Sequence, residues 1–248
     1  MAIPLKVNLK SLLVRRTATA LTVAGIGLIV MALSVVWGLA EGLKTVFRVG
    51  GSPENLVVMR GGSTTETTSG IQDANARIIS LFEGIDLGKD GQPLASGELV
   101  VIINQPRRGA KPSTDGSAWS MGANVIVRGV GPAAFDLRPN LEIVEGRRFE
   151  PGRNEVITSR SMAARFAGCG LGETIMLRRV PCTVVGLFED EGSPYQSEIW
   201  ADAKDLGAIF SRSGAVSALL LRSSDPIARE RLRAALEADP RLNVDVQD

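Results

Sequence analysis

The chain has 248 residues and a formal net charge of +1, from 28 lysine and arginine residues and 27 aspartate and glutamate residues. Because these charges nearly balance, no strong field favours nucleic acid or acidic substrates as partners. The sequence contains no histidine, which excludes histidine-based catalytic triads, HExxH zinc sites and any pH switch that needs imidazole.

Residues 1–16 predict an amphipathic elbow helix that lies on the cytoplasmic side of a membrane. Four leucines follow the spacing of one helix face, and the nearby cations fall elsewhere: Leu5, Leu9, Leu12 and Leu13. The apolar alternation from Ile3 to Leu9 also fits a strand. The position of this segment directly before a long apolar stretch favours the helix.

Residues 17–40 predict a transmembrane helix, around which the rest of the chain is organised. From Thr17 to Ala40 the sequence carries no charged side chain. At about 1.5 Å per residue this helix would be about 36 Å long, enough to cross a hydrocarbon core of about 30 Å. Ala20 and Ala24 have the small-xxx-small spacing that permits close packing against a partner helix.

The charges around the apolar stretch predict its orientation. The segment before it carries lysines and arginines but no acid, so the positive-inside rule predicts a cytoplasmic N-terminus and a main domain outside the cytoplasm. A cleaved signal peptide is the alternative, because Gly38-Leu39-Ala40 imitates a cleavage site. The apolar stretch is longer than the usual signal-peptide core of about 7–15 residues, which favours a single-pass protein of the inner membrane.

Residues 41–248 predict one extracytoplasmic α+β domain of mixed strands and few helices. Short apolar or alternating runs predict strands at residues 55–60, 98–103, 125–127, 141–144, 155–158, 174–178, 182–188, 197–200, 216–222 and 243–246. Helical spacing and capping residues predict helices at 71–82, 160–166, 203–210 and 226–238. Ser159, Asp202 and Asp225 are the expected caps. Polar composition predicts loops at 61–70 and 105–124, the second as a mobile excursion.

Patterns that carry chemistry are scarce. No GxxxxGK[ST] motif is present, so the chain has no P-loop for a nucleotide. Gly129 and Gly131 are interpreted as a turn, and the alternating glycines at 168, 170 and 172 as a loop. We therefore expect no catalytic, cofactor-binding or metal-ligating residues, no cofactor and no enzyme activity.

Two short charged runs and two cysteines are the remaining candidates for binding sites or a disulfide. The acidic run from Glu189 to Glu191 favours a solvated turn over a cation site. The basic side chains at 107, 108 and 111 favour a solvated loop over a contact with phosphates or lipid head groups. Cys169 and Cys182 favour two separate thiols, and a disulfide between them stays open at this point.

Several motifs, taken in order, resemble the N-terminal part of MacB/FtsX-type ABC transporter permeases. A V-x-G-V-x-P segment at 127–132 precedes an E-G-R-x-F segment at 145–149. A strand–helix pattern follows at 155–166, then a G-x-x-[IL]-x-L strand at 172–177 and a V-V-G at 184–186. The amphipathic segment, the apolar stretch and the strand at 55–60 match the same family, so the resemblance covers nearly the whole chain.

This resemblance implies the fold of a MacB-like periplasmic core domain and a role in transport. It implies that a cytoplasmic ABC ATPase is a partner, and that the elbow and the transmembrane helix relay its motion to the extracytoplasmic domain. A second permease copy or a C-terminal permease half, a periplasmic adaptor protein and membrane lipid are the other expected partners. An inserted lobe is expected at about 98–180.

The end of the chain departs from the family pattern, because members continue into three further transmembrane helices. The expectation is therefore a truncated or split permease subunit, or a fragment of one. The alternative function is a single-pass, membrane-anchored scaffold or adaptor that binds an extracytoplasmic protein without ATPase coupling. A secreted binding domain is a third alternative, and it requires cleavage near Ala40.

Overall fold

The computed structural model describes residues 14, 16–49, 52, 54–110, 122–190 and 192–247, and of 43–49 the backbone alone. The predicted elbow helix falls almost entirely outside these residues. The chain divides into two compact units, Met1–Phe47 and Arg48–Asp248, each of which is described by itself.

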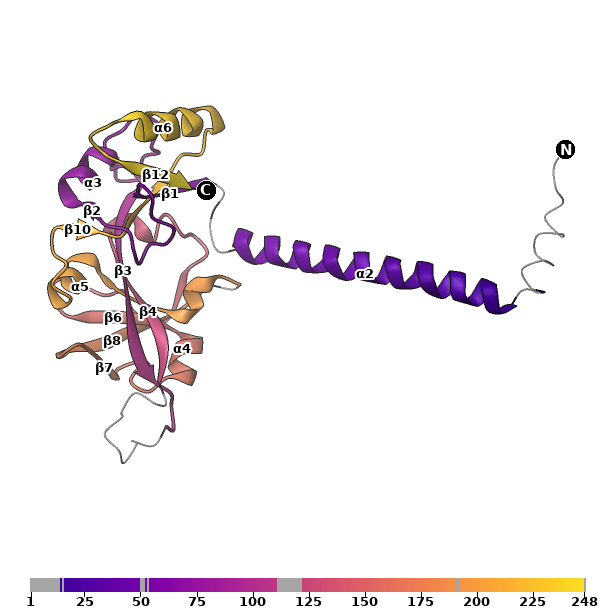
Figure 1. Cartoon of the computed structure of the whole chain (residues 1–248). Helices are drawn as coiled ribbons and strands as arrows, with labels where there is room; N and C mark the ends of the chain where they lie inside the picture. The colour runs from indigo at the N-terminus through magenta and orange to yellow at the C-terminus, as the bar shows by residue number, and fades with distance from the viewer. Residues whose placement is uncertain are drawn as a thin grey trace. The chain divides into compact units, whose positions relative to one another are not determined.

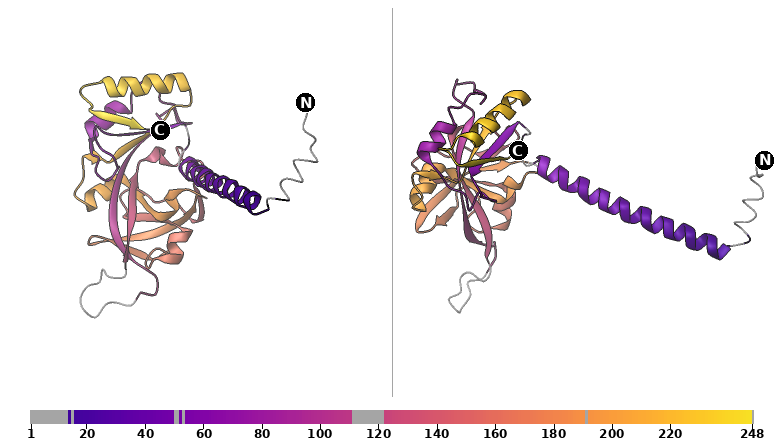
Figure 2. Two further views of the ribbon diagram at one scale, coloured as in Figure 1. Left: turned by 45° about the vertical axis from the view of Figure 1, so that its right-hand side comes forward. Right: turned by 45° about the horizontal axis from the view of Figure 1, so that its top comes forward.

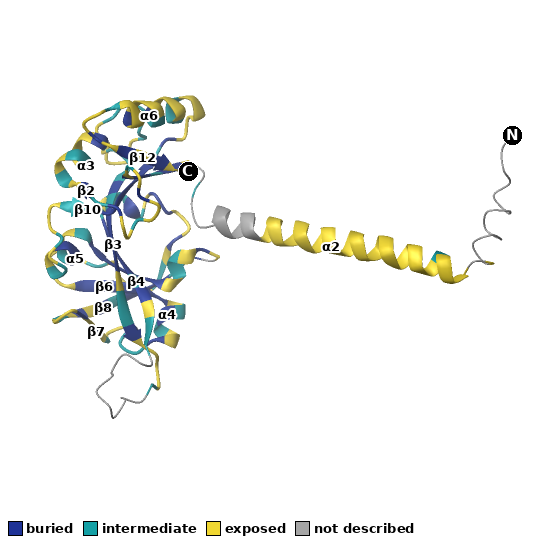
Figure 3. Ribbon diagram, viewed as in Figure 1, coloured by how far each residue is buried: buried dark blue, intermediate teal, exposed yellow. Residues whose placement is uncertain are grey.

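The first unit is dominated by the single helix α2 (Arg16–Val49), which confirms the predicted apolar helix. Its stretch Arg16–Gly42 has a mean hydropathy of 2.3, is long enough to cross a membrane and buries no side chain within the chain (Figure 3). The hydroxyls of Thr22 and Ser34 donate to the carbonyls of Ala18 and Val30 in the same helix. Satisfying polar groups inside the helix is what an apolar environment requires.

The second unit is built on a ten-stranded mixed sheet with the order β12-β1-β11-β3-β4-β9-β6-β8-β5, and β7 pairs with β8. Its strands are β1 (Asn55–Arg60), β3 (Ala95–Pro106), β4 (Gly122–Val130), β5 (Glu142–Gly146), β6 (Glu155–Ser159), β7 (Thr174–Leu177), β8 (Val180–Glu189), β9 (Glu198–Asp202), β11 (Ala218–Arg222) and β12 (Val244–Gln247). A two-stranded sheet joins β2 (Ile71–Gln72) to β10 (Ala215–Val216).

In the described part of this unit, four α-helices and two short 3₁₀ helices accompany the sheets. They are α3 (Asp73–Ile79), η1 (Pro132–Ala134), α4 (Arg160–Arg165), η2 (Pro194–Ser197), α5 (Ala203–Ile209) and α6 (Pro226–Ala238). The predicted caps are confirmed: the Ser159 hydroxyl accepts from the Met162 amide, and the carboxylates of Asp202 and Asp225 each accept from two amides of the helix that follows. These side chains satisfy backbone donors that a first helical turn leaves without partners.

The long strand β3 joins two lobes of the second unit (Figures 1 and 2). Its first residues, from Ala95 to Glu98, pair with β11, and its remaining residues pair with β4. We call β12, β1, β11, α3 and α6 the first lobe, and β4 to β9 with α4 and α5 the second lobe. Figure 1 shows β3 running from the first lobe to the far end of the second.

Each lobe has its own hydrophobic core. In the first lobe, side chains of β1, β11 and β12 pack with α3 and α6 around Leu56, Leu221 and Leu236. In the second lobe, successive residues of β9 enter cores on opposite faces of the sheet: Ile199 and Ala201 into one, and Trp200 into the other. This division follows from the alternation of side chains along a strand.

Several predicted elements need correction. The helix predicted at 71–82 spans Asp73–Ile79, and it begins late because Ile71 pairs with Val216 and is buried in the first core. The strand predicted at 216–222 is divided at Ser217, whose hydroxyl accepts from the Val100 amide and whose own amide donates to the Glu98 carbonyl.

The excursion predicted at 105–124 was too long, since β3 and β4 form a hairpin that is paired as far as Pro106 and Gly122. The pairing is made by backbone groups, so it continues through polar residues that an apolar pattern does not reveal. Residues 111–121, including Lys111, lie outside the described residues. Gly129, interpreted as part of a turn, lies within β4, where a Cβ atom would come within 2.9 Å of the Ala203 Cα on α5.

Candidate functional site: a buried arginine–glutamate network

Three adjacent strands bring opposite charges onto one face of the sheet. On β4, Arg128 is the register partner of Val100 on β3 and of Trp200 on β9. Glu98 and Glu198 each lie two residues before those partners, and residues two apart on a strand share a face. The sheet register therefore directs both carboxylates towards Arg128.

Arg128 is the centre of this network, and its guanidinium is fully engaged. Its Nε and Nη2 donate to the Glu198 carboxylate at 2.7 and 2.9 Å, and its Nη1 donates to Glu98 at 2.9 Å. Nη1 and Nη2 also donate to the two carboxylate oxygens of Glu66, both at 2.9 Å. Every N–H of the guanidinium thus has a carboxylate acceptor, in the forked geometry that makes arginine–carboxylate pairs strong.

A second arginine completes the network. Arg138 lies after η1 and donates to both oxygens of Glu98 at 2.6 and 2.8 Å. Its guanidinium carbon lies 4.5 Å from the ring centroid of Tyr195 and 4.9 Å from that of Trp200. The Trp200 indole N–H donates to Glu198 at 3.1 Å, so aromatic rings wall the network on the side of the second core.

The electrostatics of the network favour its ionised form. Burial alone would raise the pKa of Glu98, but the guanidiniums of Arg138 and Arg128 outweigh burial and lower this pKa below its ordinary value of 4.5. Burial opposes the charge of Arg128, and its glutamate partners outweigh burial and raise its pKa. Burial also raises the pKa of Tyr195, which stays neutral beside the arginines.

The arginines and glutamates of the network are held by one another in their ionised forms. Among the described residues, no group of three or more cysteine, aspartate or glutamate side chains could hold a metal ion. What the arrangement does is fix geometry: it ties β3, β4, β9, the η1 region and the loop at 61–70 to one another. Buried ionic groups can specify one arrangement of elements over its competitors.

The basic run found in the sequence lies apart from the network. Arg108 is held by Glu173 at 2.8 Å and by the Ala163 carbonyl, so its guanidinium is already engaged by protein groups. Arg107 is exposed, in keeping with the predicted solvated loop. The run therefore presents no gathered set of free cations among its described residues.

The acidic run is only partly the solvated turn that its sequence predicts. That prediction was wrong for Asp190, which is buried and has a raised pKa because of that burial. Glu189 forms an ion pair with Arg160 at 2.9 Å. Glu191 lies outside the described residues.

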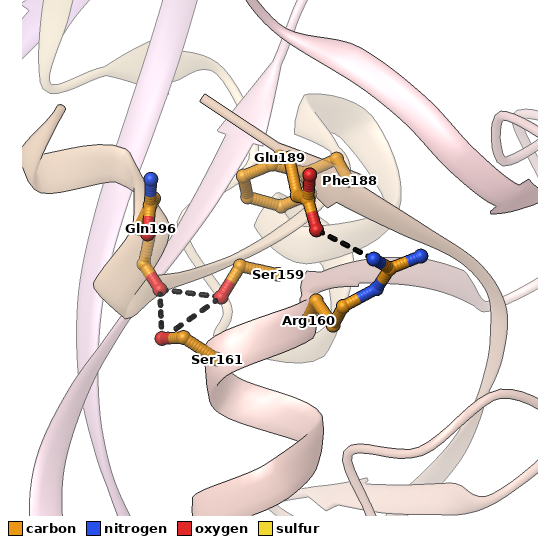
Figure 4. A pocket seen from close by; sticks show the side chains of 6 residues that line it. All are labelled: Ser159, Arg160, Ser161, Phe188, Glu189 and Gln196. Carbon is orange, nitrogen blue, oxygen red and sulfur yellow. Dashed lines mark hydrogen bonds and ion pairs between the residues drawn. The ribbon is translucent and has the colours of Figure 1, made fainter. Parts of the chain in front are cut away.

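The Glu189–Arg160 pair lines a surface pocket of about 360 Å³ (Figure 4). Beside it, the hydroxyls of Ser159 and Ser161 both donate to the backbone carbonyl of Gln196. The polar groups are thus directed at one another and hold the start of α4 against η2. This pocket is part of the packing between two elements, and it presents no converging set of free donors.

The two cysteines are free thiols in the structure and both are buried in the second lobe. The expectation of separate thiols is confirmed. Burial raises the pKa of Cys169 to about 12 and that of Cys182 to about 11, so neither thiol ionises readily near neutral pH.

Sequence reasoning missed the network, although one signal for it was present. Arg128 interrupts the apolar run from Val125 to Val130, and a lone charge in such a run needs a buried partner of opposite sign. The partners could not be named from the sequence, because Glu66 and Arg138 lie in irregular segments outside the strand that carries Arg128. Their positions depend on how the two lobes fold together.

Fold and site together define a class of protein: an α+β domain that follows one apolar helix and whose most prominent buried charges are structural. The chain belongs to the MacB-like periplasmic core domain family, whose model matches residues 19–239. The expected N-terminal part of a MacB/FtsX-type permease is thereby confirmed, as is the α+β fold class. The α+β domain is therefore a MacB-like periplasmic domain of an ABC transporter permease family.

Curated relatives support this assignment. The chain is 24% identical over 180 residues to the macrolide export ATP-binding/permease protein MacB of Rhodopseudomonas palustris, covering 64% of this chain and 27% of that protein. It is 23% identical over 208 residues to the MacB of Bradyrhizobium diazoefficiens, covering 73% and 31%. The chain therefore spans less than a third of the length of these two relatives.

Solved structures show the same fold. The periplasmic region of MacB from Actinobacillus actinomycetemcomitans aligns with a TM-score of 0.57 at 13% identity, covering 81% of this chain and 91% of that one. The extracellular domain of the noncanonic ABC-type transporter YknZ from Gram-positive bacteria aligns with a TM-score of 0.55 at 13% identity, covering 78% and 100%.

Proposed function

We propose that the chain is an ABC transporter permease subunit that couples a partner ATPase to movement of an extracytoplasmic domain. The observation that carries this proposal is the family match over residues 19–239, which includes both the apolar helix and the α+β domain. The chain contains no P-loop, so ATP hydrolysis belongs to another subunit or to a segment outside this sequence. Relatives that carry both functions in one protein are consistent with such a pairing.

Each segment has a part in the proposed coupling. Residues 1–16 form the cytoplasmic elbow, 17–40 the membrane span and 41–248 the extracytoplasmic core, with a cytoplasmic N-terminus in the inner membrane. Residues 50–54 connect α2 to β1, and in this proposal a displacement of the helix reaches the domain through its first strand. The second lobe, from β4 to α5 at residues 122–209, overlaps in this proposal the inserted lobe expected at about 98–180.

Co-purification tests the proposal. The tagged full chain, extracted in mild detergent from cells with its natural partners, should bring down an ABC ATPase at near-stoichiometric amounts. With a Leu9→Ser, Leu12→Ser double variant, the amount of ATPase that co-purifies should be at least about tenfold lower, because the elbow loses its apolar face. The matched control makes the same change at two exposed leucines of the domain, Leu81 and Leu87.

The outcomes separate the functions that remain. A full-length chain that brings down a periplasmic protein and no ATPase would overturn ATPase coupling and favour the membrane-anchored scaffold. Equal ATPase recovery from the elbow variant and the control would overturn the role of the elbow. An intact mass that shows cleavage after Ala40 would overturn the membrane span.

A further inference from the structure

We propose that Glu66 is a releasable clasp between the two lobes of the domain, carried on the loop Gly61–Gly70, which we call the strap. The proposal rests on the proposed function, in which movement enters the domain through α2 and β1. The Glu66 side chain holds the two lobes together at rest and lets them separate when β1 is displaced.

The strap is rooted in the first lobe. The Gly61 amide donates to the Asn243 carbonyl at 2.8 Å, and the Gly62 amide donates to the Asp245 carboxylate on β12 at 2.7 Å. At the other end the Ser69 hydroxyl accepts from the Arg60 amide on β1 at 2.9 Å. Both ends of the strap therefore move with β1 and β12.

The tip of the strap is held by the second lobe. Glu66 places both carboxylate oxygens on the Arg128 guanidinium of β4 at 2.9 Å. The strap thus connects the strand that follows α2 to a strand of the other lobe, and this connection passes outside the continuous strand β3. A pull on β1 acts directly on the Glu66–Arg128 pair.

Among the ion pairs of the network, the Glu66–Arg128 pair can break at the lowest cost because of the charge balance of the other groups. The inner charges of Arg128, Arg138, Glu98 and Glu198 sum to zero without Glu66. The side chains of Arg128, Glu98 and Glu198 are 5%, 2% and 5% exposed, whereas that of Glu66 is 29% exposed. Glu66 can therefore leave without stranding an unbalanced buried charge, the event that makes breaking a buried ion pair costly. Water that enters where Glu66 is exposed can then accept the hydrogen bonds that Nη1 and Nη2 of Arg128 donate to Glu66.

A second connection between the lobes has a different character. The side chains of Asn55 on β1 and Arg222 on β11 donate to the Leu137 carbonyl at 2.9 and 2.7 Å. Here the acceptor is a neutral backbone group of the turn after η1, close to Arg138 of the network. Displacing Asn55 at the start of β1 pulls on this turn as it pulls on the strap, so both connections respond to the same movement.

The test measures the distance between the lobes in the full chain, in detergent and without an ATPase. Nitroxide labels at Ile227→Cys on α6 and Met176→Cys on β7 report on the two lobes, since both residues are exposed and the native thiols are buried. In the otherwise unchanged chain we expect one narrow distance distribution. In the Glu66→Gln variant the width of this distance distribution should be at least about twice as large. Glu83→Gln, the same change at an exposed glutamate outside the network, should leave it unchanged.

Hydrogen exchange in the same variants locates the change. Glu66→Gln should speed exchange of the Thr68 and Ser69 amides by about tenfold or more. The exchange rates of the β4 and β9 amides should change by less than about twofold. An unchanged distance distribution, or faster exchange throughout the second lobe, would overturn the clasp. Neither result bears on the permease assignment, and failure to recover an ATPase would overturn that assignment while leaving these measurements intact.

Discussion

At the scale of single residues, the network separates glutamates that the sequence presents as equivalent. Glu98 lies between two arginines and is buried, and both hydrogen bonds described for the Arg138 guanidinium go to it. The contacts described for the Glu66 carboxylate are with Arg128, and the side chain is partly exposed. The same loss of charge should therefore have very different consequences at the two positions.

We expect Glu98→Gln to lower the free energy of unfolding by about 3–5 kcal/mol, because it leaves the buried Arg138 guanidinium without the carboxylate that accepts both of its described hydrogen bonds. Glu66→Gln should lower it by no more than about 1 kcal/mol, since its pair is partly solvated and the inner charges stay balanced. Urea unfolding of the full chain in detergent, followed by circular dichroism, measures both. Equal losses would contradict the charge balance assigned to the network.

Acid should destabilise the domain through Glu98. The arginines overcome the effect of burial and hold the folded-state pKa of Glu98 below its ordinary value of 4.5. A depressed pKa stabilises the fold at pH values above 4.5, and this contribution is lost as the pH falls below 4.5 through the folded pKa. We expect the unfolding temperature to be level from pH 7 to 5 and to fall between pH 4.5 and 3.

Asp239→Asn is the control for this pH dependence. The Arg241 guanidinium lowers the pKa of Asp239 to about 2, but this pair lies on the surface and outside the network. The variant should therefore keep most of the acid sensitivity. A chain whose unfolding temperature stays constant down to pH 3 would contradict the assigned role of Glu98.

The cysteines should be inert in the folded chain. Burial raises the pKa of Cys169 to about 12 and that of Cys182 to about 11, and their side chains have almost no solvent contact. At pH 8 we expect less than about a tenth of the thiol to react with Ellman's reagent within an hour, and both thiols to react at once in concentrated guanidinium. Rapid reaction of either thiol in the folded chain would place it at the surface.

At the scale of secondary-structure elements, close packing of β4 against α5 depends on Gly129. A Cβ atom at this position would approach the Ala203 Cα to 2.9 Å and the Leu206 Cδ2 to 3.0 Å. Gly129→Ala should therefore cost about 1–3 kcal/mol of stability through overpacking, measured by urea unfolding. Gly70→Ala, which meets open space, is the matched control. Equal stability of the two variants would contradict the packing.

The sequence predicts elements best where local chemistry decides them. The caps at Ser159, Asp202 and Asp225 and the apolar core of α2 follow from a few neighbouring residues, and all are observed. The extension of the β3–β4 hairpin to Pro106 and Gly122 depends on backbone pairing across a polar region, which side-chain patterns do not record. The network was missed for the same reason, since Arg128 finds its partners only through tertiary folding.

At the scale of the whole molecule, the domain is two lobes joined by the continuous strand β3, by the chain segment between α5 and β11, and by side-chain connections at the strap and at Leu137. Most of the sheet is fixed by ladders of backbone hydrogen bonds, whereas the strap is held to the second lobe through Glu66. Such a structure fits the proposed relay of movement, because the Glu66–Arg128 connection can break while the hydrophobic cores of both lobes stay intact. In the proposed function, a partner ATPase is the source of the movement and the two lobes are the parts that move.

The most direct test of this account is the distance between labels at Ile227→Cys and Met176→Cys in the purified complex with its ATPase, recorded before and after trapping with ATP and vanadate. We expect trapping to shift the distribution in the otherwise unchanged chain. In Glu66→Gln the distribution should already be broad before nucleotide is added. A distribution that nucleotide leaves unchanged in the intact complex would contradict the proposed coupling of ATP hydrolysis to movement between the lobes.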